Sequence, residues 1–251
     1  MMNELVTAII PLHNHERFVC DAVESVVENT YPNKRLIVVE NGSKDNGPVK
    51  VLSMMNKENR QAKNSGNVLQ VLGERKGVSL MLVKIPNGIG PSSARNVGIK
   101  IGWDETKYFA FLDSDDIYHK EKIAKSVSKF TDEVAVVYSD YETLNDEGLR
   151  LVQFKEPYSK NRLLQECIVN CDSLISKKAF EKCGLFDESL RVCEDYDRWL
   201  NFSEHFLLYH IPENLVTIRV GNHSSSSQVN KQLWEESYKK VFGKMRKRLS
   251  T

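Results

Sequence analysis

The chain has 251 residues, of which 41% are hydrophobic and 27% are charged, and its formal net charge at pH 7 is +1. This is enough apolar material for one full α/β core, and the balanced charge gives no reason to expect a nucleic-acid partner. The five cysteines contain no Cys-x-x-Cys pair, and no stretch reaches the ~18 apolar residues of a membrane span. We therefore expect a cytoplasmic protein with reduced thiols, without a zinc knuckle, a signal peptide or a transmembrane helix.

The first 140 residues alternate between short apolar runs and amphipathic stretches. This alternation predicts a strand–helix–strand order, which favours parallel strands joined by right-handed crossovers. The polar stretch 56–77 is interpreted as an insertion on the rim of the sheet. We predict strands over 5–10 (ended by Pro11), 36–39, 79–85, 108–112 and 134–138, and helices over 18–29, 49–55, from the 87–96 segment to about 103, and over 119–130.

After residue 140 the pattern is looser. We predict extended segments over 151–154, 173–176, 206–210 and 215–218, and helices over 160–167, 177–183 (closed by Gly184) and 194–205. Basic and aromatic residues interleave over 229–251, which predicts a basic C-terminal helix. This helix either lies on an anionic membrane or packs on the domain through Trp234, Val241 and Phe242.

The stretch 108–116 carries the most chemical information, because an apolar run ends there in three acids. Asp113 and Asp115 are two residues apart, so both side chains would leave the same face of an extended backbone. Acids at the carboxyl end of a buried strand lie where open α/β sheets bind ligands, and Mg²⁺ or Mn²⁺ would compensate their repulsion. The alternative is that Asp115 or Asp116 caps the helix that starts near His119.

Four parts of the chain, taken in order, resemble a family-2 glycosyltransferase of the GT-A fold. Each motif is modest alone, but the ordered set, which covers about 7–219, is specific. The motifs are residues 7–14 (Thr-Ala-Ile-Ile-Pro-Leu-His-Asn) with 37–45 (Ile-Val-Val-Glu-Asn-Gly-Ser-Lys-Asp), 87–98 (Asn-Gly-Ile-Gly-Pro-Ser-Ser-Ala-Arg-Asn-Val-Gly), 111–116 (Phe-Leu-Asp-Ser-Asp-Asp), and 184–188 (Gly-Leu-Phe-Asp-Glu) followed by 194–197 (Glu-Asp-Tyr-Asp).

The resemblance implies an α/β fold with a central, mostly parallel sheet flanked by helices, in one domain over 1–251. Residues 1–140 would bind the nucleotide-sugar, 141–228 the acceptor, and 229–251 would form the basic helix. The implied activity is that of a metal-dependent inverting enzyme of polysaccharide biosynthesis, with Mn²⁺ or Mg²⁺ as cofactor. A UDP-sugar donor and a glycan or lipid-linked saccharide acceptor are expected, and the basic helix would provide any peripheral membrane contact.

The resemblance also assigns roles to single residues. The residues that match the family's donor site, and would therefore contact the nucleotide-sugar, are Pro11, His13, Asn14, Glu40, Asn41, Arg95 and Asp113. Asp115 matches the metal-binding acid of the family's Asp-x-Asp, and Asp195 matches the catalytic base of its Glu-Asp pair. Glu40 and Asn41 stand where many members have two aspartates, and an asparagine can both accept a hydrogen bond from the base and donate one.

These roles agree with what sugar transfer requires. A metal at Asp115 would neutralise the leaving diphosphate as a Lewis acid. A carboxylate at Asp195 would remove the proton of the attacking hydroxyl, a contribution of ~10²–10⁴-fold. Taken alone, Glu194 and Asp195 would equally suit the acid-rich start of a helix.

Three further positions are weaker candidates. Asp172 and Glu194 are candidate acceptor contacts, with a turn or cap role as the alternative for Asp172. His223 is a candidate for the metal site, with a mobile serine-rich tract as the alternative. The remaining histidines, His15 among them, show no partner pattern.

Two other classes of protein compete with this interpretation. Gly88-x-Gly90-x-x-x-Ala94, between a predicted strand and a helix, resembles a dinucleotide fingerprint, so an NAD-dependent oxidoreductase is one alternative. That motif follows the third predicted strand instead of the first and leaves Asp113 and Asp115 unexplained. The other alternative is a degenerate, non-catalytic transferase that serves as a scaffold, which only the departure at 40–41 favours.

Overall fold

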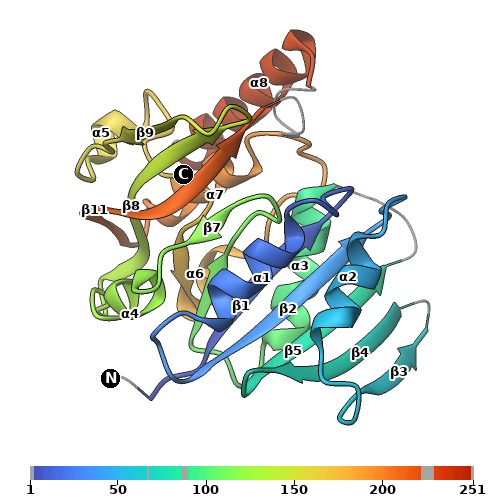
Figure 1. The fold of residues 1–251 in the computed structure, drawn as a ribbon. Coiled ribbons are helices and arrows are strands. Elements are labelled where there is room, and N and C mark those ends of the chain that lie inside the picture. Colours follow the sequence, from blue (N-terminus) through green and yellow to red (C-terminus); the bar gives the residue numbers. More distant parts are fainter. Residues whose placement is uncertain (1–2, 67, 86–89, 222–228, 250–251) are drawn as a thin grey trace.

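The computed structural model describes residues 3–66, 68–85, 90–221 and 229–249, and these form one mixed sheet with helices on both faces (Figure 1). The strand order is β3-β4-β5-β2-β1-β6-β10-β8-β11-β7, with β9 beside β8. The strands are β1 (Val6–Leu12), β2 (Lys34–Asn41), β3 (Gln61–Ser65), β4 (Val68–Arg75), β5 (Val78–Ile85), β6 (Tyr108–Phe111), β7 (Ile117–Tyr118), β8 (Val134–Asn145), β9 (Arg150–Gln153), β10 (Leu174–Ser176) and β11 (Leu207–Val220). The helices are α1 (Val19–Val27), α2 (Gly47–Met54), α3 (Pro91–Gly102), α4 (Lys122–Val127), α5 (Lys160–Leu163), α6 (Lys177–Cys183), α7 (Glu194–Phe202) and α8 (Lys231–Leu249).

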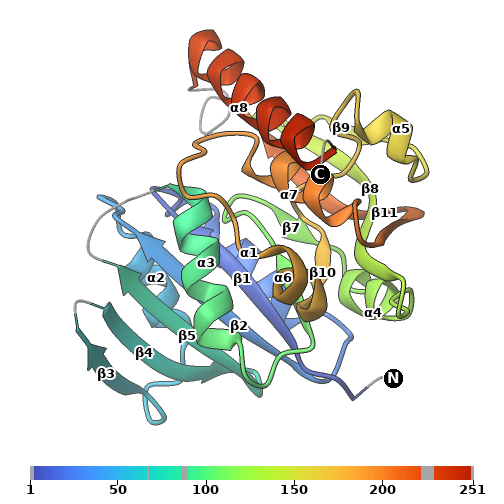
Figure 2. The same cartoon turned by 180° about the vertical axis from the view of Figure 1, so that it is seen from behind.

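The centre of the sheet is parallel, as the strand–helix–strand pattern predicts. β5, β2, β1 and β6 are neighbours in that order, and each pair among them is parallel. α1 connects β1 to β2 on one face, and α3 leads into β6 on the other (Figure 1, Figure 2). Ala8 and Ile10 lie in the core cluster beneath α1, whereas Ile9 lies in the cluster beneath α3. Because both faces of β1 are buried, its sequence is a continuous apolar run.

The first strand does not end at Pro11, contrary to our expectation. β1 continues through Pro11, which pairs with Val39 of β2, and ends at Leu12. On its other side β1 pairs with β6 only as far as Ile9 opposite Phe111. The missing N–H of proline is tolerated because the strand has lost one neighbour at that point.

The segment 56–77 contributes strands to the sheet. Its antiparallel hairpin of β3 and β4 joins the edge of the sheet, and β4 pairs along its length with β5. Every residue of β3 is exposed, in agreement with its polar sequence. The rim position is therefore confirmed, but the two strands are an addition that the polar sequence did not predict.

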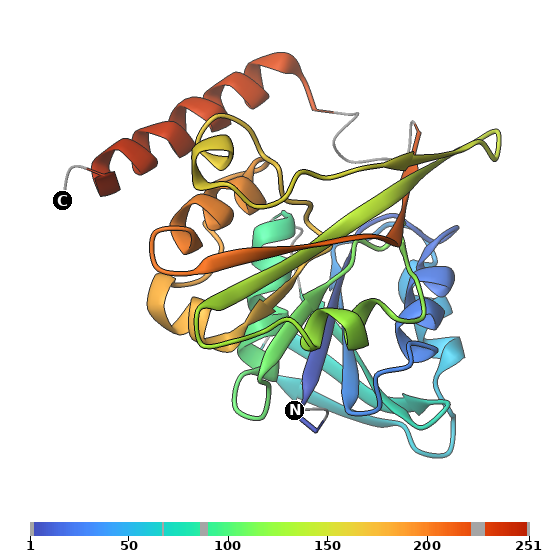
Figure 3. The same ribbon diagram turned by 90° about the vertical axis from the view of Figure 1, so that its left-hand side faces the viewer.

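The second half of the sheet is built on two long strands. β8 and β11 run parallel and side by side (Figure 3), with register shifts between Ile211 and Asn214 and between Asn214 and Thr217. The first of these irregularities falls between the two short strands predicted for this region, which are one strand in the structure. β10 is antiparallel to both β6 and β8, so it attaches the second half to the parallel centre.

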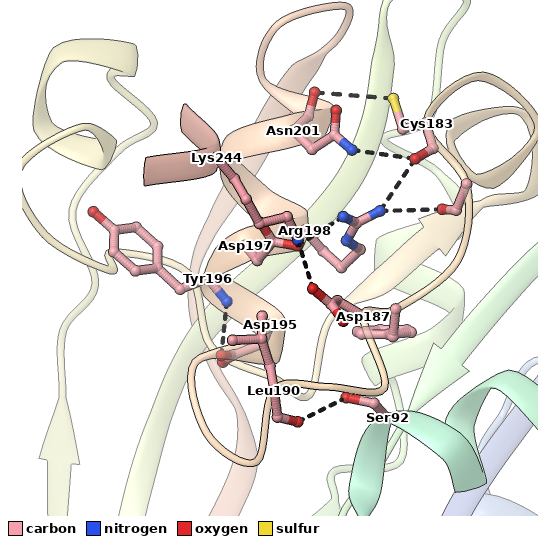
Figure 4. A network of polar contacts seen from close by, with 12 residues as sticks. Ser92, Cys183, Asp187, Leu190, Asp195, Tyr196, Asp197, Arg198, Asn201 and Lys244 are labelled. Carbon is pink, nitrogen blue, oxygen red and sulfur yellow. Dashed lines mark hydrogen bonds and ion pairs between the residues drawn. The ribbon is translucent and has the colours of Figure 1, made fainter. Parts of the chain in front are cut away.

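The basic C-terminal helix, α8, packs on the domain. The ring of Phe242 lies 6.1 Å from that of Tyr196 on α7, centroid to centroid. Nζ of Lys244 donates to Oδ2 of Asp197 at 2.6 Å and to Oδ2 of Asp187 at 3.0 Å (Figure 4). The structure thus supports the packing alternative for this helix. Across the described part of the chain, no helix combines the length and the apolar character needed to cross a membrane.

Gly98→Ala should destabilise the protein, because α3 packs tightly on β1. A Cβ at Gly98 would lie 2.7 Å from Cγ2 of Ile9, so the helix must move away from the sheet. Overpacking of this kind costs about 1–3 kcal/mol, measured as a loss of unfolding free energy in a urea titration.

Gly243→Ala is the matched control. Gly243 is exposed on α8, and a Cβ there meets nothing within 4 Å. The gain in helix propensity should stabilise the protein by about 0.5–1 kcal/mol. A stabilising effect at both glycines would contradict the tight contact between α3 and β1.

Candidate active site

A cavity of about 450 Å³ opens at the carboxyl ends of β1, β2 and β6, and its volume lies in the range of roughly 300–1,000 Å³ typical of small-molecule sites. One wall comes from the ends of these strands and the start of α3. The second wall comes from residues 191–195, from the end of β11, from Val229 and from the first turn of α8. The cavity is therefore bounded by segments from both halves of the chain.

Most of the predicted site residues line this cavity. They are Pro11, His13, Asn41, Arg95, Asp113, Asp115, Glu194 and Asp195. Asn14, Glu40 and Asp172 are not among the lining residues. His223 lies outside the residues that the structure describes.

Polar side chains join the loops after β1 and β2. Nδ1 of His13 lies 2.9 Å from the backbone oxygen of Asn41, and its Nε2 lies 3.0 Å from Nδ2 of Asn14. Since the amide NH₂ of Asn14 can only donate, we assign the imidazole proton to Nδ1, which donates to Asn41. Asn14 has a left-handed backbone (φ 55) and accepts a hydrogen bond from the N–H of Lys44 at 2.8 Å. It therefore braces these loops without facing the cavity.

Glu40 is buried and shapes the turn after β2. Its Oε1 accepts a hydrogen bond from the N–H of Ser43, and its Oε2 has no hydrogen-bond partner among the described residues. The neighbouring Asn41 does line the cavity, and its Nδ2 donates to the carbonyl of Gly90 at 3.0 Å. This bond connects the end of β2 to the start of α3.

Arg95 is the central charge of the site. Its Nη1 donates to Oε1 of Glu194 at 2.6 Å, and its Nη2 donates to Oδ1 of Asp113 at 2.8 Å. Burial alone would lower the pKa of Arg95, but the two carboxylates outweigh this effect and raise the pKa above its ordinary value. The guanidinium group therefore stays charged while it joins the end of β6 to the start of α7.

Asp115 and Asp116 are held in place by the end of β11. The backbone N–H of Arg219 donates to Oδ1 of Asp116, and its Nη1 donates to the backbone oxygen of Asp115, both at 2.8 Å. Burial, followed by repulsion from the neighbouring carboxylates, raises the pKa of Asp116 well above its ordinary value. The capping alternative is wrong, because β7 intervenes and α4 begins only at Lys122, after Glu121.

Asp195 lies in the first turn of α7. The preceding Cys193 has a left-handed backbone (φ 60), an uncommon conformation for a residue other than glycine, which redirects the chain as the helix begins. Oδ1 of Asp195 accepts a hydrogen bond from the N–H of Tyr196 at 2.7 Å (Figure 4). Burial, followed by repulsion from Glu194, raises the pKa of Asp195 to about 7. A carboxylate with this pKa can act as a general base near neutral pH.

Asp172 lies beneath Asp113. It is fully buried, and its Oδ1 accepts a hydrogen bond from the backbone N–H of Asp113 at 3.4 Å. Burial, followed by repulsion from Asp113, raises the pKa of Asp172 to about 7. The side chain of Lys122 is also fully buried, and burial lowers its pKa to about 8. The position of Asp172 suits support of the acidic segment better than direct contact with an acceptor.

The acids at the cavity fit a hard divalent cation. Asp113 and Asp115 line the cavity, and Mg²⁺ and Mn²⁺ prefer carboxylate oxygen ligands. Within the described residues, Asp113, Cys171 and Asp172 also present ligand atoms within 4.8 Å of one another. However, Asp172 is fully buried, and burial raises the pKa of the Cys171 thiol well above its ordinary value. Asp113 and Asp115 are therefore the residues that would hold such an ion.

Several cavity residues were not predicted. Nδ1 of His15 lies 2.7 Å from Oγ of Ser114 and 3.7 Å from Oδ1 of Asp115, although its sequence neighbourhood gives no sign of a partner. Further lining residues are Asp116 after β6, Cys171 before β10, Arg191 and Val192 before α7, Arg219 near the end of β11, and Val229 and Trp234 at the start of α8. Only the proximity of Asp116 to the Asp-x-Asp pair could have indicated one of them.

Comparison with known proteins finds relatives along most of the chain. The family model described as "Glycosyl transferase family 2" matches residues 7–184. An uncharacterized glycosyltransferase of Rickettsia prowazekii is 31% identical, over 98% of this chain and 73% of its own. The Escherichia coli protein WfgD, whose name describes a UDP-Glc:α-D-GlcNAc-diphosphoundecaprenol β-1,3-glucosyltransferase, is 26% identical over 80% of this chain and 70% of its own.

Solved structures share the fold. S. aureus TarS 1-349 in complex with UDP-GlcNAc matches with a TM-score of 0.70 at 17% identity, over 92% of this chain and 63% of that chain. The mannosyltransferase PcManGT of Pyrobaculum calidifontis, in complex with GDP-Man and Mn²⁺, matches with a TM-score of 0.65 at 16% identity, over 88% of this chain and 59% of that chain. This chain thus spans about 60% of either solved chain. The likeness confirms the expected GT-A fold.

Arg95→Met should strongly destabilise the protein, because it leaves the carboxylate of Glu194 buried without its cation and also removes the partner of the partly exposed Asp113. Removal of one partner from a buried ion pair costs about 3–5 kcal/mol, measured as a loss of unfolding free energy by chemical denaturation. Arg162→Met is the matched control, since the side chain of Arg162 is 41% exposed in its pair with Glu156. Its loss should stay below about 1 kcal/mol. Equal losses for the two variants would contradict the central place of Arg95.

Proposed function

The chain belongs to glycosyl transferase family 2, and we propose that it is a metal-dependent inverting enzyme that transfers a sugar from a UDP-linked donor to a hydroxyl group of a lipid-linked saccharide. The observation that carries the proposal is the shared cavity, which Asp113, Asp115 and Asp195 all line. The named donor and acceptor of WfgD, and the UDP-GlcNAc bound to TarS, support this choice of substrates. Family membership overturns the NAD-dependent oxidoreductase alternative.

We assign the nucleotide to the wall formed by residues 1–140. Pro11, His13 and Asn41 would lie against the base, and Asp113 would contact the ribose or the metal. Asn14 and Glu40 would act indirectly, because their hydrogen bonds hold the loops after β1 and β2. Arg95 would fix the orientation of Asp113 through the hydrogen bond between them.

Asp113 and Asp115 would hold Mn²⁺ or Mg²⁺ beside the diphosphate of the donor. When bound, such an ion neutralises the negative charge that develops on the leaving diphosphate. The Mn²⁺ in the PcManGT complex supports a divalent ion in this fold. His223 stays a predicted further ligand.

Asp195 is the proposed base. Its carboxylate takes the proton of the acceptor hydroxyl while the hydroxyl oxygen forms a bond to C1 of the donor sugar. The bond from C1 to the diphosphate oxygen breaks, the diphosphate leaves with the electron pair, and this single displacement inverts C1. The pKa of about 7 makes Asp195 more basic than an ordinary aspartate.

The acceptor would lie against residues 141–228 and the start of α8. Glu194 would then position Arg95, and Asp172 would support Asp113, so we revise both from acceptor contacts to positioning residues. A lipid-linked acceptor resides in a membrane. Exposed basic residues of α8, such as Lys239 and Arg246, would make any peripheral contact with that membrane.

Asp115→Ala should abolish Mn²⁺-dependent binding of UDP, measured by calorimetry with and without the metal. The loss should exceed the ~10–100-fold effect typical of residues that only support a metal ligand. Asp104→Asn removes an exposed acid outside the cavity and should bind UDP as the wild type does. Unchanged binding by Asp115→Ala would rule out its role as metal ligand.

Asp195→Asn should keep UDP binding but lose transfer by ~10²–10⁴-fold, because the amide cannot take up the hydroxyl proton. For the wild type, kcat/KM should rise with pH and level off above about 7, since Asp195 must be deprotonated. A rise centred near the ordinary aspartate value of 3.8 would contradict this assignment.

The raised pKa of Asp195 makes activity rise with pH, but it makes the contribution of this group to folding stability fall with pH. The native state holds the proton of Asp195 up to pH about 7, whereas the unfolded state releases it near 3.8, so this group's contribution to stability falls as pH rises between those values. Asp195→Asn should therefore flatten the dependence of the unfolding free energy on pH over this interval. An undiminished dependence would show that Asp195 does not carry the shift.

A further inference from the structure

One arginine of the cavity is not used by the interactions described so far. Among the described lining residues the arginines are Arg95, Arg191 and Arg219. Two carboxylates neutralise Arg95, and Arg219 donates to Oδ2 of Asp21 at 2.7 Å. Arg191 is exposed and makes no hydrogen bond or ion pair with the part of the chain that the structure describes. Its charge is available to a ligand.

Arg191 belongs to the part of the cavity lining that we assigned to the acceptor. It lies in the loop that leads into α7, four residues before the proposed base, Asp195. Its Cδ and Nη1 lie 3.7 Å and 3.9 Å from the point where a Cβ on Gly90 would stand. Because Gly90 has no side chain, the stem of Arg191 can pass close to the start of α3.

Trp234 provides an apolar surface on the same wall. It lies on the first turn of α8, lines the cavity and is half-buried, with its ring 6.1 Å from that of Tyr238. Val192 and Val229 extend the apolar part of this wall. An aromatic face and a cation that line the same cavity suit a sugar ring that carries a negatively charged group.

We propose that Arg191 and Trp234 form the acceptor subsite, where Trp234 stacks on the acceptor sugar and Arg191 binds a phosphate attached to that sugar. This inference rests on the proposed function and narrows the acceptor to a glycosyl diphosphate. The carboxylate of Asp195 lines the same cavity without a cation within ion-pair distance among the described residues, and it would repel an anionic acceptor, so such an acceptor needs a cation to hold it. A guanidinium group binds a phosphate through two parallel hydrogen bonds.

The experiment compares two probes on the full chain saturated with UDP and Mn²⁺: an alkyl α-GlcNAc diphosphate, and the alkyl α-GlcNAc glycoside that lacks the phosphates. By calorimetry, the wild type should bind the diphosphate probe roughly tenfold more tightly than the neutral one. Arg191→Gln should remove this preference and leave the affinity for UDP unchanged. Arg191→Lys should retain part of the preference, and Lys63→Gln, which removes an exposed charge outside the cavity, should retain all of it.

Trp234→Ala provides an independent readout. It should weaken both probes by a similar factor, roughly three- to tenfold, whereas Trp234→Phe should restore binding. Melting curves identify any loss of binding that comes from unfolding of α8. Three results would overturn the inference. The wild type could show no preference for the diphosphate probe, Arg191→Gln could keep the preference, or Arg191→Gln could bind UDP more weakly than the wild type.

Failure of the proposed function would appear earlier, as absence of Mn²⁺-dependent UDP binding before any probe is added.

Discussion

A single buried guanidinium group connects the two halves of this protein at its cavity. Arg95, on α3, donates to Asp113 at the end of β6 and to Glu194 at the start of α7. The carboxylate of Glu194 is buried, so it would be costly in that position without a cation. Each of the two carboxylates belongs to a segment that also supplies an acid with a proposed role, Asp115 in one case and Asp195 in the other. The separation between the proposed metal ligand and the proposed base is therefore set by one side chain, and the rest of the cavity is arranged around that contact.

The aspartates at this site differ in how readily they release a proton, because their surroundings differ. Asp113 shares the cation of Arg95, so its charge is compensated. Asp195 and Asp172 have no cation within ion-pair distance among the described residues, and burial raises the pKa of each to about 7. A compensated carboxylate is suited to hold ligands, whereas one with a raised pKa can exchange a proton near neutral pH. Only Asp195 of these two reaches the cavity, so it alone can exchange a proton with a ligand.

Local sequence patterns are enough to predict the parallel centre of the sheet and the acids at its carboxyl edge. Burial on both faces makes the central strands continuous apolar runs, and the change from Leu112 to Asp113 marks where β6 gives way to the cavity. The hairpin of β3 and β4 lacks such a signal, because an edge strand whose residues are all exposed shows no apolar alternation. Arg191 and Trp234 could not be predicted either, since a loop and a distant helix bring them to the cavity through tertiary contacts alone. The family motifs located most of the remaining site, but they could not show that Glu40 and Asp172 point into the protein.

The wall that carries Arg191 and Trp234 also bears on how such a protein changes over evolutionary time. Its residues come from the loop before α7, from the end of β11 and from α8, and none of them lies in the parallel centre of the sheet. α8 is attached to α7 and the neighbouring loop by side chains such as Lys244 and Arg248. Substitutions in its first turn can alter the shape of this wall while the packing of the sheet and the Arg95 contact stay as they are. Under the proposed function, a lineage with this arrangement would pass from one acceptor to another by substitutions on this wall, while the residues proposed to bind the donor stay unchanged.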